Sequence, residues 1–266
     1  MMEEKMALKR KFTREDIRGL YGNEAEKHGL EGTSTIQDRR TRDLEVETIS
    51  SYLRDDARVL EVGCGNGYLA TKMIERFSIS LEGFDFSEEL VALALKQTHA
   101  HARGSAAFEV GDVLTYDKMD TFDIAYSVRC IQNLESFDDQ KIALRNIVAA
   151  LKVGGEYIME ECFWTGLNNL NEARAELDLA PIAESWHNTF FDESDTIEYL
   201  KSLGCVYVDQ NAFLSGYYFG SRVLLPALTP KNKKVSSSSR LNDYFAALPP
   251  AGDFCPMKVL RFRRER

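Results

Sequence analysis

The chain has 266 residues, of which 33 are Lys or Arg and 42 are Asp or Glu, so its formal net charge is −9. The hydrophobic share of 44% and the charged share of 28% are ordinary for a globular protein of one or two domains. This composition excludes collagen-like, disulfide-dense and wholly disordered classes. The acidic balance argues against broad nucleic-acid binding, which needs many cations against phosphates.

The N-terminal residues and the cysteines predict a cytoplasmic protein. The first 20 residues carry charges throughout and lack the apolar stretch of about 7–15 residues found in secretory signals. No window of the chain approaches the ~20 apolar residues that span a bilayer. The five cysteines are odd in number and form no C-x-x-C pair, a pattern typical of reduced thiols rather than of disulfides or a zinc site. We therefore expect no metal and no membrane segment.

Helices and strands alternate along most of the chain. A first helix is predicted at 42–53, where Val46, Ile49 and Leu53 recur at helical spacing. Further helices are predicted at 67–77, 87–97, 138–152 and 194–203. Strands are predicted at 58–62, 79–86, 106–110, 122–127, 156–161, 205–210 and 257–262. Such alternation predicts right-handed crossovers and a mostly parallel α/β sheet.

Two long segments, 163–192 and 212–256, interrupt this alternation. The second contains the polar run KNKKVSSSS, which predicts a mobile loop. Long excursions inside a compact domain are usually functional lids or disordered segments. In a doubly wound sheet both would lie near the carboxyl ends of the strands, so we expect them to form a lid over a substrate.

A glycine-rich turn carries the strongest functional signal. In VLEVGCGNGYLA, residues 59–70, glycines at 63, 65 and 67 follow a strand and open a helix. Glycine allows backbone to approach a ligand closely, and the first turn of a helix presents free N–H groups. The turn therefore predicts a nucleotide-like ligand, although a tight turn without a ligand would carry the same glycines.

Two aspartates at the ends of the next strands strengthen this hypothesis. Asp85 lies 22 residues after Gly63, where a carboxylate could accept both hydroxyls of a ribose. Asp112 follows the third strand and could meet an exocyclic amine. Either aspartate alone is more often a cap or turn residue, but features at three successive strand ends seldom coincide by chance.

Together these residues resemble the class I S-adenosylmethionine-dependent methyltransferases. The matching pieces are Glu61-x-Gly63-x-Gly65-x-Gly67, Asp85 in GFDFS, Gly111-Asp112, FDIAYSV and LKVGGEYIMEE. They cover roughly residues 42–162. The resemblance implies a Rossmann-like, doubly wound sheet of seven strands, with the last strand antiparallel and inserted beside the sixth. It also implies S-adenosyl-L-methionine as the cofactor and S-adenosyl-L-homocysteine as the product.

The resemblance also assigns cofactor contacts. The glycine turn with Cys64 would hold the methionine part, Asp85 with Phe86 the ribose, and Asp112 the adenine amine beside the backbone of Val113. An N-terminal flap carrying Tyr21 would cover the cofactor, and Arg42 or Arg39 would reach the methionine carboxylate, although nearby arginines more often form a solvated face. The candidate set is completed by two residues at the end of the fourth strand, Ser127 and Arg129.

Two other functions stay open at this point. A nicotinamide-dependent dehydrogenase would show Gly-x-Gly-x-x-Gly, but here position 68 is Tyr68 and the third glycine comes one residue early. A protein that binds the cofactor without catalysis would carry the same turn. Only an active transferase would release S-adenosylhomocysteine.

Few residues suggest the acceptor, because the cofactor's methyl group is already reactive and the protein must mainly align a nucleophile. The segment 127–134 lacks the Asn/Asp-Pro-Pro-Tyr/Phe motif of enzymes that methylate nucleic-acid bases or Gln amides. Arg129 could bind a carboxylate or pair with Asp123 or Glu160. His187 in the first insertion could accept a proton near pH 7, or simply be hydrogen-bonded within the lid.

Glu160 and Glu161 alternate in direction at the end of the fifth strand, so one of them could face the pocket and orient an acceptor. We expect one domain with a flap at 1–41, a cofactor core at 42–162, lid segments at 163–192 and 212–256, and a C-terminal core at 193–211 and 257–266.

The expected reaction is methyl transfer to an oxygen of a small metabolite or sugar-like acceptor. Transfer to the nitrogen of a small amine or amino acid is second, and a protein or RNA substrate is third. Glu160 and His187 are the catalytic candidates. We expect a monomer or homodimer that binds neither nucleic acid nor membrane.

Overall fold

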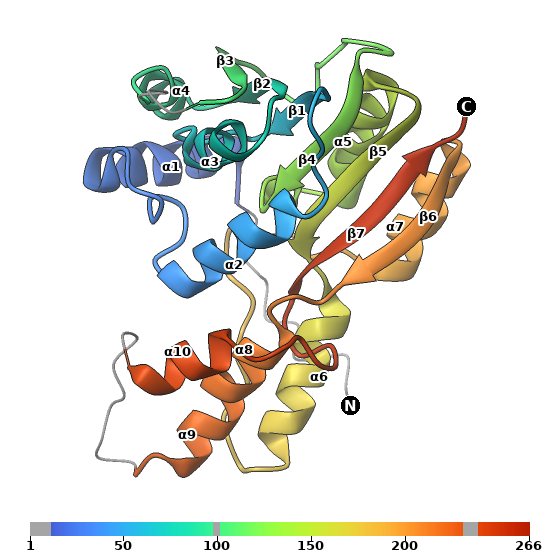
Figure 1. Cartoon of the computed structure of the whole chain (residues 1–266). Helices are drawn as coiled ribbons and strands as arrows, with labels where there is room; N and C mark the ends of the chain where they lie inside the picture. Colours follow the sequence, from blue (N-terminus) through green and yellow to red (C-terminus); the bar gives the residue numbers. More distant parts are fainter. Residues whose placement is uncertain (1–11, 98–101, 231–238) are drawn as a thin grey trace.

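The computed structural model describes residues 12–97, 102–230 and 239–266 (Figure 1). At its centre lies a sheet of seven strands in the order β3-β2-β1-β4-β5-β7-β6. Strand β7 pairs antiparallel with both β5 and β6, and the other neighbouring pairs are parallel. The strands are β1 (Arg58–Val62), β2 (Ser80–Asp85), β3 (Ser105–Val110), β4 (Phe122–Val128), β5 (Leu151–Cys162), β6 (Cys205–Asn211) and β7 (Met257–Arg264). The predicted fold, including the last strand beside the sixth, is confirmed.

Helices cover both faces of the sheet and extend beyond its carboxyl ends. Those of the N-terminal half are α1 (Arg14–His28), α2 (Arg39–Ser50), α3 (Tyr68–Arg76), α4 (Glu88–Ala94), the 3-10 turn η2 (Ile131–Asn133) and α5 (Phe137–Ala150). Those of the C-terminal half are α6 (Trp164–Ala175), α7 (Glu193–Ser202), α8 (Ser215–Phe219), the π-helical turn η3 (Gly220–Leu224), α9 (Leu225–Leu228) and α10 (Arg240–Ala246). Helix α1 lies within the N-terminal flap expected at 1–41 and contains Tyr21.

Side-chain caps explain where several helices begin. Ser87 caps α4 by accepting a hydrogen bond from the Leu90 N–H, and the first turn of α4 carries the expected acidic residues, Glu88 and Glu89. Asp38 caps α2 by accepting from the Arg40 and Thr41 N–H groups, so this helix begins three residues before the predicted position 42. The predicted helix 138–152 ends earlier, at Ala150, because β5 already starts at Leu151 and continues through Gly154 and Gly155.

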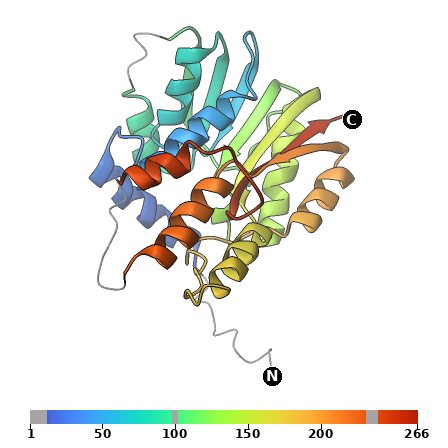
Figure 2. The ribbon, with the colours of Figure 1, turned by 60° about the horizontal axis from the view of Figure 1, so that its bottom comes forward.

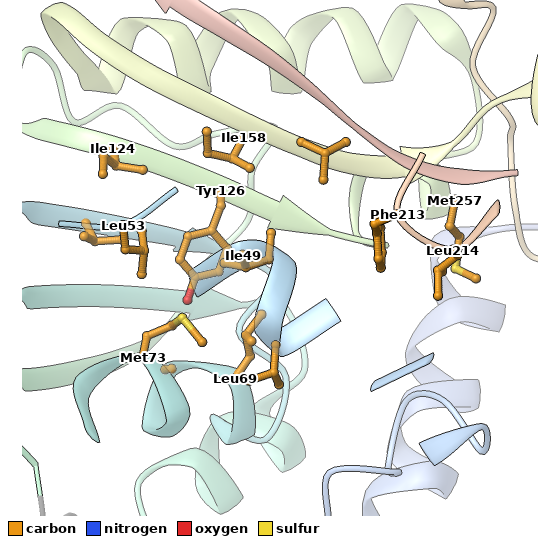
Figure 3. Packing of buried hydrophobic residues seen from close by; sticks show 14 of the residues in the cluster. Ile49, Leu53, Leu69, Met73, Ile124, Tyr126, Ile158, Phe213, Leu214 and Met257 are labelled. Atoms are coloured by element: carbon orange, nitrogen blue, oxygen red, sulfur yellow. The ribbon is translucent and has the colours of Figure 1, made fainter. Parts of the chain in front are cut away.

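Alternate residues of the central strands build one apolar cluster on each face of the sheet. On one face α2 and α3 pack against β4 and β5 (Figure 3), through Ile49, Leu53, Leu69, Met73, Ile124, Tyr126 and Ile158. On the other face α5 packs on the same strands, through Leu144, Ile147, Val148, Ala125 and Met159. Each fully buried large apolar side chain contributes about 1.5–3 kcal/mol to stability, so this core needs no cross-link. All five cysteines are free thiols.

The two insertions lie together beyond the carboxyl ends of the strands (Figures 1 and 2). Helix α6 comes from the first insertion and contacts η3 of the second, and α10 packs on α8 and η3. The run KNKKVSSSS falls almost wholly within 231–238, outside the described residues. The division of the chain into flap, core and lids stays a prediction. Within the described residues, no helix is both long and apolar enough to cross a membrane.

Candidate active site

A cavity opens at the carboxyl ends of β1, β2 and β4, with about 990 Å³ of empty space including its mouth. All but two of the predicted cofactor-binding residues line it. They are Tyr21, Arg42, Gly63, Cys64, Gly65, Asp85, Phe86, Asp112, Val113 and Arg129. The exceptions are Gly67, which begins α3 below the cavity, and Ser127, whose hydroxyl is buried against Tyr157 and Glu161.

The glycine turn has the backbone that its sequence predicts. Gly63, Gly65 and Gly67 all have positive φ angles, of 76°, 52° and 75°, a region that other residues seldom adopt. At Gly63 a Cβ atom would also collide with the side chain of Cys130. The turn therefore requires glycine for conformation and for space, and its backbone forms the floor of the cavity.

Asp85 ends β2 and is held by two backbone groups. Its Oδ2 accepts a hydrogen bond of 2.9 Å from the Gly65 N–H, and its Oδ1 accepts one of 2.9 Å from the Ser87 N–H. Burial raises the pKa of Asp85, and these hydrogen bonds oppose that rise. An ionised carboxylate has about four acceptor positions, so Asp85 keeps acceptor capacity for the hydroxyl groups of a ligand.

Asp112 follows β3 and has a charged partner that the sequence did not suggest. Its Oδ1 accepts a hydrogen bond from the Leu114 N–H at 3.0 Å. Its Oδ2 lies 2.5 Å from Nη2 of Arg14, at the start of α1. The oxygen that the resemblance assigns to the adenine amine is therefore paired with Arg14. No sequence pattern singles out Arg14, because its role depends on where α1 packs.

The segment 12–32, here called the strap, covers the cavity. Ile17 and Tyr21 of α1 line the cavity, and the Tyr21 hydroxyl donates a hydrogen bond of 2.8 Å to Oδ1 of Asn133. The far end of the strap is tied down by Asn66, whose Nδ2 donates to the backbone oxygens of Gly29 and Glu31. The expected position of Tyr21 in a flap agrees with this geometry.

Charged side chains gather at the end of the cavity that the resemblance assigns to the methionine part of the cofactor. Arg129, with a positive φ of 52°, donates from Nε to Glu45 at 2.7 Å and from Nη1 to the Thr35 oxygen at 2.9 Å. Arg42 lies 3.0 Å from the same Glu45. Neither expected carboxylate pairs with the Arg129 guanidinium. Asp123 pairs with Lys152 at 2.7 Å, and Glu160 accepts only from the Arg129 backbone N–H, through its own backbone oxygen at 2.9 Å.

Glu45 could have been expected from its spacing, since it lies three residues after Arg42 on a helix. Glu61, which ends the motif before Gly63, also lines the cavity. Burial raises the pKa of Glu61 to about 8, although Arg42 opposes the rise.

Glu160 and Glu161 face opposite sides of the sheet, as predicted. Glu161 accepts hydrogen bonds from the Ser127 hydroxyl and from the N–H groups of Ile131 and Gln132, so it caps η2. Burial raises its pKa to about 7. Glu160 is fully buried, and neither carboxyl oxygen has a hydrogen-bond partner among the described residues. Burial and the charge of Glu45 raise the pKa of Glu160 well above its usual range.

His187 does not line the cofactor cavity. It lies in the loop between α6 and α7, and its backbone oxygen accepts a hydrogen bond of 3.1 Å from Nδ2 of Asn133. Burial and the charge of Arg129 lower the pKa of His187, so its imidazole is neutral at pH 7. Its Nδ1 has no partner among the described residues.

A profile described as a methyltransferase domain matches residues 53–212, more than half of the chain. The chain belongs to this methyltransferase family. The expected class I S-adenosylmethionine-dependent methyltransferase and its cofactor are thereby confirmed at the level of the family, and the dehydrogenase alternative is not supported.

Individual relatives of this methyltransferase are distant. Phosphoethanolamine N-methyltransferase 2 of Caenorhabditis elegans is 31% identical over 102 residues, 38% of this chain and 23% of that protein. The ubiquinone biosynthesis O-methyltransferase of Xanthomonas axonopodis pv. citri is 30% identical over 145 residues, 53% of this chain and 55% of that protein. The chain thus spans less than a quarter of the length of the phosphoethanolamine relatives it matches.

Among solved structures, the magnesium protoporphyrin IX methyltransferase of Synechocystis PCC 6803, with bound S-adenosylhomocysteine, has a TM-score of 0.62. The match covers 95% of this chain and 100% of that one at 13% identity. At this identity the likeness shows the fold alone.

Proposed function

We propose that this methyltransferase transfers the methyl group of S-adenosylmethionine to an oxygen of a small, enclosed acceptor such as a small metabolite or sugar-like molecule. The observation that carries the proposal is the cavity at the glycine turn, which the strap covers. Glu160 and His187 do not line this cavity, but both feel the charge of Arg129, which does.

The residues around the cavity fit the parts of the cofactor. The glycine turn and Arg42 would receive the methionine part, and Asp85 has free acceptor positions for the ribose hydroxyls. Asp112 would accept a hydrogen bond from the adenine amine once Arg14 moves away from Oδ2 of Asp112. When bound, S-adenosylmethionine supplies a sulfonium methyl group that needs no further activation. The protein must therefore mainly position the acceptor and exclude water.

Glu160 and His187 would divide the acceptor chemistry between them. The protonated Glu160 carboxyl can donate one hydrogen bond and accept another, so it would orient the acceptor hydroxyl beside Arg129. His187 is neutral at pH 7 and would take the hydroxyl proton as the methyl group is transferred. Both roles are proposals.

Transfer to the nitrogen of a small amine or amino acid is the alternative, because distant relatives are named for N- and for O-methyl transfer. A neutral imidazole could also accept the proton that an ammonium group must lose before its nitrogen attacks the methyl group. A small acceptor agrees with the net charge of −9, which disfavours nucleic acid. Self-association up to a homodimer is compatible with this proposal.

A product screen tests the function. The full chain is incubated with a metabolite extract and S-adenosylmethionine carrying a deuterated methyl group, and acceptors are recognised by a mass shift that requires active protein. We expect a labelled product and an equal amount of S-adenosylhomocysteine, with the methyl group on oxygen by carbon NMR. A methyl group on nitrogen would select the alternative. Binding of the cofactor without turnover in any extract would contradict both.

A further inference from the structure

The strap and a distant loop of the chain converge on one side chain, Asn133. Its Oδ1 accepts the hydrogen bond of 2.8 Å from the Tyr21 hydroxyl of the strap. Its Nδ2 donates to the His187 backbone oxygen at 3.1 Å and to Oδ1 of Asn188 at 2.9 Å. Asn133 is buried, so water competes little for these bonds. One carboxamide thus connects the cover of the cofactor cavity with the segment 182–189, here called the histidine loop.

A second contact joins the same two segments independently. Phe12, at the start of the strap, packs edge-on against Trp186 of the histidine loop, with ring centroids 6.4 Å apart. Trp186 in turn packs edge-on against His187. The strap and the histidine loop therefore meet through an aromatic contact and through Asn133, although more than 150 residues separate them in the chain.

Asn133 is itself rigidly held. It belongs to η2, and the Glu161 carboxylate fixes the start of that turn by accepting from the Ile131 and Gln132 N–H groups. The histidine loop is tied to the same turn by the Thr189 N–H, which donates to the Gln132 oxygen at 2.6 Å. The direction of the Asn133 amide is set by the His187 backbone oxygen, which can only accept and so requires the amide nitrogen on its side.

We propose that Asn133 is a positioning residue that joins the strap and the histidine loop into a single lid. Binding of the cofactor in its cavity then fixes the position of His187. The cofactor therefore binds before the acceptor. This inference rests on the proposed function. A ligand can shift the equilibrium between an open and a closed lid only if it contacts the two forms differently. The cofactor would meet that condition, because the Ile17 and Tyr21 side chains of the strap line its cavity in this structure and would leave it if the strap opened.

The chain offers a test that needs no acceptor. It contains two tryptophans, so the Trp164→Phe variant retains Trp186 as its single fluorescent tryptophan. Trp186 is 52% exposed, and its emission reports contact with Phe12. S-adenosylhomocysteine is titrated into this variant. We expect a saturable shift of the Trp186 emission to shorter wavelength at the affinity found by calorimetry, and slower hydrogen exchange in a peptide that covers 182–189.

Two variants in this background break the connection on different sides. Tyr21→Phe keeps the ring that lines the cavity but removes the donor to Asn133. Asn133→Asp keeps the acceptor for Tyr21 but replaces the donor to Asn188 and His187. Tyr21 and Asn133 both line the cavity, so S-adenosylhomocysteine should bind up to about 10²-fold more weakly, the range expected for one or two hydrogen bonds, and each titration is carried to saturation. In both we expect the Trp186 shift and the protection of 182–189 to be lost.

Tyr199→Phe is the matched control. The Tyr199 hydroxyl donates to the Lys141 backbone oxygen at 3.0 Å, between α7 and α5 and away from the cavity. This variant should respond like the parent. The proposal is overturned if the parent binds S-adenosylhomocysteine without a response of the histidine loop, or if the Tyr21 and Asn133 variants respond as the parent does. A folded parent that does not bind S-adenosylhomocysteine would instead overturn the proposed function itself.

Discussion

Two buried carboxyl groups, at the cofactor end and at the proposed acceptor end of the site, are held in opposite ways. Asp85 accepts hydrogen bonds from two backbone N–H groups, of Gly65 and Ser87. The carboxyl oxygens of Glu160 have no hydrogen-bond partner among the described residues. Burying a polar group without a partner is unfavourable, whereas backbone donors fix a carboxylate before any ligand arrives. The Asp85 carboxylate is therefore held in place without a ligand, whereas under the proposed function the Glu160 carboxyl would gain its hydrogen-bond partner from the acceptor.

The largest expected effect is on kcat, from substitution of His187 at the proposed acceptor end. If His187 accepts the acceptor proton, His187→Ala should lower kcat by about 10²-fold or more, the usual contribution of a general base. Affinity for S-adenosylhomocysteine should stay within a fewfold, because His187 does not line the cofactor cavity. The measurement is kcat against pH with the acceptor found by mass shift, beside calorimetry. An unchanged kcat across pH would remove His187 from the mechanism.

At the cofactor end we expect a substitution to weaken cofactor binding, whereas the His187 substitution should lower kcat. Asp85→Ala removes a carboxylate that orients Gly65 and would receive the ribose hydroxyls. Hydrogen bonds to charged groups contribute about 1.5–3 kcal/mol each, so we expect S-adenosylhomocysteine to bind about 10–10²-fold more weakly by calorimetry while the protein stays folded. Asp138→Ala is the control, since Asp138 is an exposed residue paired with Lys141. Equal affinity in both variants would take Asp85 out of the site.

This contrast also separates what the sequence could predict from what it could not. That Gly63, Asp85 and Asp112 line one cavity could be predicted, because each lies at the end of a strand and local chain order brings these ends together at one edge of the sheet. The Arg14 pairing, the Glu45 partner of Arg129 and the Asn133 connection depend on how α1, α2 and the histidine loop pack in three dimensions. Ser127 was misplaced because residues at a strand end alternate in direction, and its side chain faces Glu161.

A pH experiment tests the charge at the cofactor end. Burial raises the pKa of Glu61 to about 8, so most of this carboxyl is protonated in the free protein at pH 7. The ammonium group of the cofactor would favour the ionised form. Binding should then release a proton at pH 7, and affinity should rise with pH between 6 and 8 by at most about tenfold per pH unit. Calorimetry in buffers of different ionisation enthalpy measures the proton count.

Glu61→Gln removes the titrating group, so its proton release at pH 7 should be near zero and its affinity should vary little with pH. If parent and variant released the same number of protons, another group would be responsible and Glu61 would stay neutral in the complex.

The smallest effect concerns stability at the acceptor end, where Glu160 and Glu161 provide a matched pair. Burial and Glu45 raise the pKa of Glu160 in the folded chain, so between its unfolded and folded pKa values the folded state holds the extra proton. Stability contributed by this proton is present at low pH and is lost as the pH rises through the folded pKa. Glu160→Gln, which cannot ionise, should therefore match the parent at pH 5 and become the more stable chain towards pH 8.

Glu161→Gln should be less stable by about 1–3 kcal/mol at both pH values, because Glu161 accepts from the N–H groups that begin η2. Urea unfolding at the two pH values measures both differences. If Glu160→Gln lost as much stability as Glu161→Gln, the Glu160 carboxyl would already have a hydrogen-bond partner within the protein, without an acceptor.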